Sequence, residues 1–129
     1  MSHKYRIMVI DDEPIVGKRL NLVFKKMGYD VLVYTSGKKA LEALDTEPFD
    51  VVVTDLKMDI DGFEVFEKAK RKNPRAKVII ITGYADAHNA RRALQEGVFD
   101  FIPKPFRLDD LKNAVLRAIE NIKNEDKTS

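Results

Sequence analysis

The amino-acid sequence predicts an α/β protein with a doubly wound (βα)5 architecture, in which helices cover both faces of a five-stranded parallel sheet. Short runs rich in β-branched residues alternate five times with longer segments of helical periodicity. Three of the short runs are continuously apolar, as expected for strands that are buried on both faces. Connections this short require right-handed crossovers, but the alternation alone leaves the strand order open.

The boundaries of the predicted elements follow from these runs and from residues that begin or end helices. The strands are expected at residues 6–10, 30–34, 50–54, 77–81 and 99–102. Pro14 suits the first turn of the first helix, and Gly28 its left-handed end. The other helices are expected to follow Ser36, to begin near Asp61 and end before Pro74, to run from Asp86 to Gly97, and to carry an apolar stripe from Leu108 to Ile122.

The apolar stripe is lost near the C-terminus, which predicts one domain at residues 1–123 and a flexible tail at residues 124–129. The total of 129 residues suits one domain, and the absence of cysteine excludes disulfides and thiolate metal sites. The apolar runs are far shorter than the about 20 residues that cross a bilayer. A net charge of +2 gives no general attraction to nucleic acids or acidic membranes. We therefore expect a cytoplasmic domain that binds neither directly.

Polar residues gather where the predicted strands end. Asp11, Asp12 and Glu13 follow the first strand, Asp55 follows the third, Thr82 ends the fourth and Lys104 lies just beyond the fifth. The carboxyl ends of parallel strands meet at one edge of a sheet, where ligands bind in such folds. Clustered carboxylates repel one another and need a cation, and a set of oxygen ligands favours Mg²⁺ or a similar hard ion such as Mn²⁺.

Over residues 5–122 the chain resembles the receiver (phosphoacceptor) domain of bacterial two-component response regulators. The resemblance rests on Asp11-Asp12, Asp55, Thr82-Gly83 and Lys104-Pro105, which follow successive strands in the family's order. It implies a CheY-like, flavodoxin-like fold with strand order 2-1-3-4-5. It also implies a role in phosphorelay signal transduction, with a histidine kinase or phosphotransfer protein as partner. Residues 81–85 and 99–106 resemble regulators of the nitrogen-control type.

The resemblance assigns roles at the acidic edge. Asp55 is expected to accept the phosphoryl group, and the domain to catalyse only its own phosphorylation and dephosphorylation. Asp11, Asp12, Asp55 and the backbone carbonyl of Lys57 are expected to bind Mg²⁺.

Further roles implied by the resemblance concern the response to phosphorylation. Lys104 and Thr82 are expected to contact the phosphoryl group, and Lys104-Pro105 to be a cis peptide. Thr82 and Phe101 are expected to switch the face made by the fourth helix, the fifth strand and the fifth helix, with dimerisation on activation as a family expectation. On its own, each of the two residues also suits a purely structural role.

The segment after Asp55 departs from the family pattern. Receivers usually carry Met-Pro after the acceptor, whereas here Met58 is followed by Asp59, and the segment up to Gly62 is one residue shorter. We expect altered geometry in this loop and an added negative charge from Asp59 beside the metal site.

Four alternatives remain beside the receiver interpretation. They are a metal-dependent phosphohydrolase, a nucleotide or flavin binder, a phosphorylation-independent interaction domain and, less favoured, a nucleic-acid surface formed by a basic run. The run is Lys68, Lys70, Arg71, Lys72, Arg75 and Lys77, which also suits a solvated helix end. The output is also open between a downstream effector and an output domain of a longer regulator, and the nitrogen-control resemblance favours the second.

Overall fold

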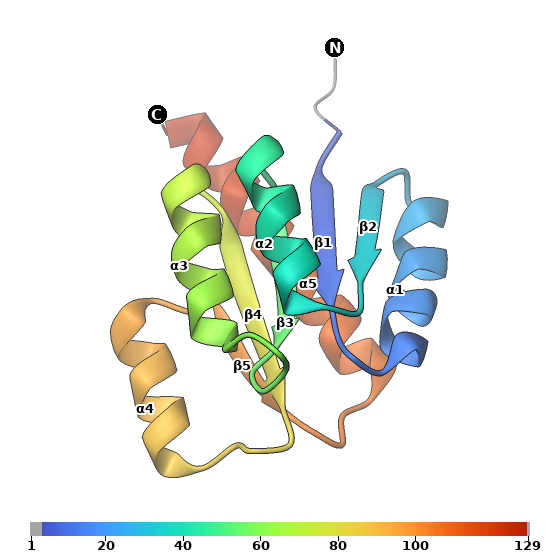
Figure 1. Ribbon diagram of the computed structural model, residues 1–129. Helices are drawn as coiled ribbons and strands as arrows, with labels where there is room; N and C mark the ends of the chain where they lie inside the picture. The colour runs from blue at the N-terminus through green and yellow to red at the C-terminus, as the bar shows by residue number, and fades with distance from the viewer. Residues whose placement is uncertain (1–3, 129) are drawn as a thin grey trace.

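The computed structural model describes residues 4–128 and contains five strands that alternate with five helices (Figure 1). All strand pairs are parallel, and the sheet order is β2-β1-β3-β4-β5. The strands are β1 (Arg6–Ile10), β2 (Asp30–Tyr34), β3 (Val51–Asp55), β4 (Lys77–Thr82) and β5 (Asp100–Pro103). The helices are α1 (Pro14–Lys26), α2 (Gly37–Thr46), α3 (Gly62–Lys72), α4 (Ala87–Glu96) and α5 (Leu108–Thr128). The predicted fold class and the strand order implied by the resemblance are both confirmed.

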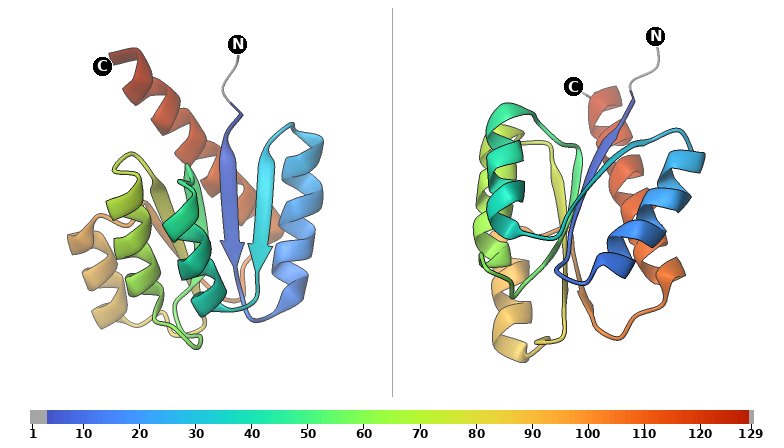
Figure 2. Two further views of the ribbon diagram at one scale, coloured as in Figure 1. Left: turned by 45° about the horizontal axis from the view of Figure 1, so that its top comes forward. Right: turned by 45° about the vertical axis from the view of Figure 1, so that its right-hand side comes forward.

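The helices form two layers, one on each face of the sheet (Figure 2). Helices α1 and α5 pack on one face, and α2, α3 and α4 pack on the other. Successive side chains of β1 alternate between the two layers, because the side-chain period of a strand is two. Ile7 and Val9 join the core beside α1 and α5, whereas Met8 and Ile10 join the core beside α2, α3 and α4. These are called the α1/α5 core and the α2–α4 core below.

Most helix ends follow the residues that predicted them. Ser36, Asp61 and Asp86 are the N-caps of α2, α3 and α4, and each side chain accepts a hydrogen bond from a backbone N–H of the first turn. Gly28 and Gly97 have φ values of 90° and 89°, the left-handed conformation in which glycine avoids a steric penalty. No helix in the described part of the chain is long and apolar enough to cross a membrane.

The C-terminal segment differs from the prediction, because α5 continues through Thr128 instead of giving way to a tail at residue 124. Ion pairs replace the lost apolar stripe: Lys77 Nζ lies 2.6 Å from Glu125 Oε1, and Arg75 pairs with Asp126. A prediction based on apolar periodicity could not include contacts between charged side chains so far apart in sequence. Residue 129 of the predicted tail lies outside the described residues.

Candidate functional site

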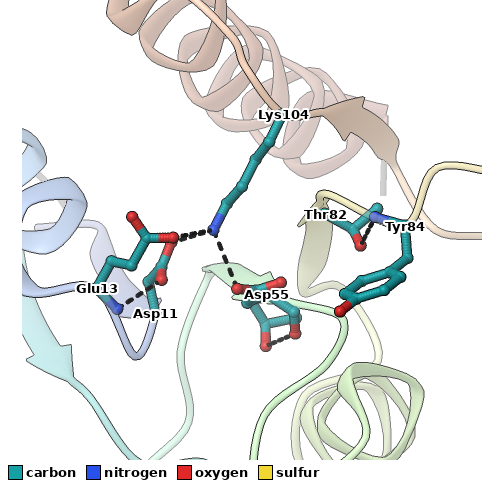
Figure 3. Close-up of polar contacts among 7 residues, drawn as sticks. Asp11, Glu13, Asp55, Thr82, Tyr84 and Lys104 are labelled. Atoms are coloured by element: carbon teal, nitrogen blue, oxygen red, sulfur yellow. Dashed lines mark hydrogen bonds and ion pairs between the residues drawn. The ribbon is translucent and has the colours of Figure 1, made fainter.

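The carboxyl ends of β1, β3, β4 and β5 bring the predicted polar residues to one edge of the sheet (Figure 3). Asp55 is the last residue of β3 and Thr82 the last of β4, while Asp11 directly follows β1. Asp11 and Asp55 are 2% and 6% exposed, so both carboxylates lie largely out of contact with water. Lys104 reaches them from the segment between β5 and α5, and its peptide bond to Pro105 is cis, as predicted.

The Lys104 ammonium group is the centre of the site. Its Nζ atom lies 3.1 Å from Asp55 Oδ2, 3.2 Å from Asp11 Oδ2 and 3.3 Å from Glu13 Oε1. Glu13 was expected to follow the first strand beside Asp11 and Asp12, but no role was predicted for it. The backbone N–H of Glu13 also donates a 2.8 Å hydrogen bond to Asp11 Oδ1. One ammonium group therefore contacts three carboxylates but can balance only one of their negative charges.

Burial and charge oppose each other at this site. Burial raises the pKa of Asp11 above its usual value, although the hydrogen bond from Glu13 and the contact with Lys104 act in the other direction. For Lys104, burial disfavours the charged form, but the contacts with Asp55 and Asp11 outweigh it and raise the pKa. The ammonium group therefore stays protonated at any physiological pH.

The carboxylates fit a divalent cation. Asp11, Asp12 and Asp55 each offer an oxygen, and these oxygens all lie within 4.8 Å of one another. Asp11 Oδ2 is buried without a hydrogen-bond partner, since its contact with Lys104 is an ion pair that lacks hydrogen-bond geometry. The Lys104 ammonium group, which Asp11 shares with Asp55 and Glu13, satisfies this buried oxygen only in part, and a bound cation would complete its interactions. Acidic oxygens at this spacing can bind a hard metal ion.

Thr82 and Phe101 occupy different environments near this edge. The Thr82 side chain is fully buried, and its Oγ1 accepts a 2.8 Å hydrogen bond from the backbone N–H of Tyr84 (Figure 3). Phe101 of β5 is half-buried and packs against the α2–α4 core. Thr82 thus borders the acidic edge, and Phe101 lies on the side of the sheet that α4 covers.

The loop between β3 and α3 gives Asp59 a different place from the one expected. Its carboxylate accepts hydrogen bonds from the backbone N–H groups of Gly37 and Lys38, at 2.8 and 3.2 Å, and from Ser36 Oγ at 3.1 Å. The bonds from Gly37 and Lys38 lower the pKa of Asp59. Its charge therefore lies at the N-terminus of α2, where the helix dipole favours it, and is not one of the carboxylates that meet at the cluster.

Lys57, in the same loop, makes a contact that the sequence analysis missed. Its Nζ atom lies 4.5 Å from the centroid of the Tyr84 ring, which places the ammonium group over the face of an exposed aromatic side chain. The contact links the loop after β3 to the loop after β4. No sequence motif pairs these two positions, so the contact could be recognised only in the folded structure.

The basic run is largely engaged within the protein. Lys68 and Lys72 lie 2.7 and 3.8 Å from Asp45 Oδ1, and Lys70 Nζ donates to the carbonyl oxygens of Pro74 and Ala76. Arg75 and Lys77 pair with α5 as described above. These contacts give most of the run a structural role within the protein.

Comparison with known proteins agrees with this geometry. The family model of the response regulator receiver domain matches residues 7–116. The transcriptional regulatory protein GlrR of Escherichia coli K12 is 38% identical over 122 residues, which cover 93% of this chain and 28% of GlrR. The DNA-binding transcriptional regulator NtrC of Klebsiella pneumoniae is 32% identical over 118 residues, which cover 91% of this chain and 25% of NtrC.

Similarity extends to solved structures. A CheY-like response regulator receiver domain from Methanospirillum hungatei JF-1 matches with a TM-score of 0.86 and 27% identity, over 95% of this chain and 99% of that one. The chain belongs to the response regulator receiver family of two-component signalling. Its similarity to nitrogen-control regulators is confirmed, and it spans about a quarter of the length of GlrR and NtrC.

Proposed function

We propose that this receiver domain accepts a phosphoryl group on Asp55 in a reaction that requires Mg²⁺. The observation that carries the proposal is the position of the Asp55 carboxylate, which is 6% exposed, 3.1 Å from Lys104 Nζ and beside the carboxylates of Asp11 and Asp12. Phosphoryl transfer needs mainly positioning and neutralisation of charge, and this site offers both.

The reaction exchanges one phosphorus bond for another. An oxygen of the Asp55 carboxylate attacks the phosphorus of a phosphohistidine, the O–P bond forms, and the N–P bond breaks. The departing histidine nitrogen keeps the electron pair and takes up a proton. Asp11, Asp12, Asp55 and the Lys57 backbone carbonyl would hold the Mg²⁺, which supplies positive charge to the phosphoryl oxygens when bound. Mn²⁺ would suit the same ligands.

Lys104 and Thr82 supply the remaining contacts to the phosphoryl group. Lys104, already 3.1 Å from Asp55, pairs with a phosphoryl oxygen once the carboxylate becomes an acyl phosphate. The Thr82 hydroxyl turns toward another phosphoryl oxygen and gives up its hydrogen bond with the Tyr84 N–H. Rotation of Phe101 then remodels the α4–β5–α5 face, which is a two-state change driven by a local charge.

The partners follow from this reaction. A histidine kinase or phosphotransfer protein in the cytoplasm donates the phosphoryl group, and the altered α4–β5–α5 face acts on a downstream effector or on an output domain of a longer regulator. Dimerisation through this face on activation belongs to the same proposal.

Phosphorylation in vitro tests the proposal. Acetyl phosphate with Mg²⁺ should add one phosphoryl group to the protein, and beryllofluoride with Mg²⁺ should produce a matching non-covalent complex. Intact-mass spectrometry should show no addition to Asp55→Asn, while the surface variant Asp45→Asn is modified like the wild type. Retention of the phosphoryl group by Asp55→Asn would overturn the assignment, and turnover of phosphate esters beyond one equivalent would favour a phosphohydrolase.

A further inference from the structure

The β3–α3 loop, residues 56–61, holds a carboxylate whose role the receiver chemistry does not explain. We propose that Asp59 is a positioning residue for the divalent-cation site: it ties the tip of this shortened loop to the N-terminus of α2 and thereby holds the backbone of Lys57 in place. The inference rests on the proposed function, because it concerns the affinity for the cation that phosphoryl transfer requires.

Both oxygens of Asp59 are used in the attachment. Oδ1 accepts from the Gly37 N–H at 2.8 Å, and Oδ2 accepts from Ser36 Oγ at 3.1 Å and from the Lys38 N–H at 3.2 Å. The first N–H groups of a helix have no partner within the helix. Ser36 itself caps α2 through the Lys39 N–H, so Asp59 serves the two donors that the helix's own cap leaves free.

A close backbone approach supports the same attachment. A Cβ atom at Gly37 would lie 2.8 Å from Ile60 Cβ and 3.2 Å from Asp59 Oδ1. The loop tip therefore lies nearer to α2 than any other residue at position 37 would allow. Met58 and Ile60, on either side of Asp59, are partly buried against the α2–α4 core, which holds the tip from a second direction.

The base of the loop is closed as tightly as its tip. The Gly62 N–H donates to the Leu56 carbonyl at 2.8 Å, and Lys57 forms an antiparallel bridge with Asp61. Met58 is the single residue between Lys57 and Asp59, so the tip of the loop can move little relative to its base. Release of Asp59 would let the Lys57 peptide change orientation. Groups that orient a metal ligand affect metal affinity without touching the metal.

Two simpler roles compete with this one. In the first, Asp59 acts only through its negative charge and attracts a cation at a distance. In the second, it acts only as a helix cap and stabilises α2 without affecting the site. A variant that breaks the attachment from the α2 side separates these roles. Gly37→Ala keeps the charge of Asp59 but drives the new methyl group into Ile60.

The experiment is a Mg²⁺ titration of the full chain at constant ionic strength, followed by calorimetry and by backbone amide NMR. Asp59→Ala and Gly37→Ala should each weaken Mg²⁺ binding by about ten-fold, the lower end of the effect of groups that orient metal ligands. The double variant should bind Mg²⁺ about as tightly as either single variant, because both substitutions break the same attachment. Glu64→Gln, which removes an exposed acid from the first turn of α3, should stay within about two-fold.

Each other result has a definite meaning. If Asp59→Ala weakens binding while Gly37→Ala does not, the effect is one of charge, and the positioning role is overturned. It is also overturned if circular dichroism shows both variants less stable but their Mg²⁺ affinity is unchanged. If Asp59→Ala does not fold, Gly37→Ala decides alone. If the wild type shows no saturable binding that Asp12→Asn removes, the proposed function fails first, and the inference with it.

Discussion

Helices α4 and α5 precede and follow the edge strand β5 in the chain and pack on opposite faces of the sheet, but they are held in very different ways (Figure 1). The inner face of α5 is a continuous stripe of fully or almost fully buried residues: Leu111, Ala114, Val115, Ala118, Ile119 and Ile122. In α4 the buried residue is Ala93, whereas Leu94 is 81% exposed. Buried apolar area is the main source of stability, so the two helices make very unequal contributions.

The remaining contacts of α4 are few and near the surface. Arg92 lies over the Phe63 ring of α3, 4.0 Å from its centroid, and also pairs with Glu96. Segments that have few buried contacts and whose hydrogen bonds are exposed to solvent typically open locally at low free-energy cost. Helix α5 is therefore firmly anchored to the sheet, whereas displacement of α4 costs less free energy than displacement of α5. This asymmetry suits the proposed switch, in which Phe101 on the α4 side changes position.

Truncation of one leucine in each of the two helices should produce the largest difference in the free energy of unfolding. Leu111→Ala in α5 should lower the free energy of unfolding by about 3 kcal/mol, because it removes a fully buried side chain and leaves a cavity. Leu94→Ala in α4 should change it by less than about 0.5 kcal/mol, since that side chain is in water. Urea unfolding followed by circular dichroism measures both. Similar losses in the two variants would show that α4 is as firmly held as α5.

Removal of the α4 cap should have a smaller and more local effect. The Asp86 side chain accepts a 2.8 Å hydrogen bond from the Asn89 N–H, and loss of such a cap costs about 1 kcal/mol. In Asp86→Ala, amide hydrogens of α4 should exchange about five-fold faster, while those of α5 keep their protection, because α4 opens without unfolding the sheet. Hydrogen exchange measured by NMR checks this. Equal acceleration in both helices would mean that they open as one unit.

Much of the fold and the site was predictable from the sequence because it depends on local patterns. The alternation of strands and helices follows from apolar periodicity, and the position of Asp55 and Thr82 at one edge follows from their place at strand ends. The strand order and the site roles came from the family resemblance, because the residue pattern alone left the order open. The strand boundaries moved only slightly: β3, β4 and β5 each end one residue later than predicted.

The parts that sequence reasoning missed depend on contacts between segments far apart in the chain. Asp59 faces α2 because Gly37 lets the two backbones approach, and no local pattern links positions 37 and 59. The place of Glu13 after β1 was predicted, but its contact with Lys104 was not. At the end of α5 the apolar stripe stops, but the helix continues, and its charged residues pair with Arg75 and Lys77 at the start of β4. This last difference leads to the weakest of the expected effects.

The helical end of α5 should contribute a small, pH-dependent part of the stability. The hydrogen bond from Lys77 holds the pKa of Glu125 below its usual value. A carboxyl group with a lowered folded pKa stabilises the protein above its unfolded pKa, about 4.3, and this stabilisation is lost as the pH falls through the folded pKa. Glu125→Gln should therefore be less stable than the wild type at pH 7, by less than about 1 kcal/mol because the pair is partly exposed.

The difference between wild type and Glu125→Gln should shrink toward zero in acid and also in high salt, which screens surface charges. Urea unfolding across this pH range measures it. Glu120→Gln, an exposed position on the same helix without the Lys77 contact, is the matched control and should leave the pH profile nearly unchanged. If the two variants behave alike at every pH, the contact with Lys77 does not hold the end of α5, and the stability of that helix comes from its apolar stripe alone.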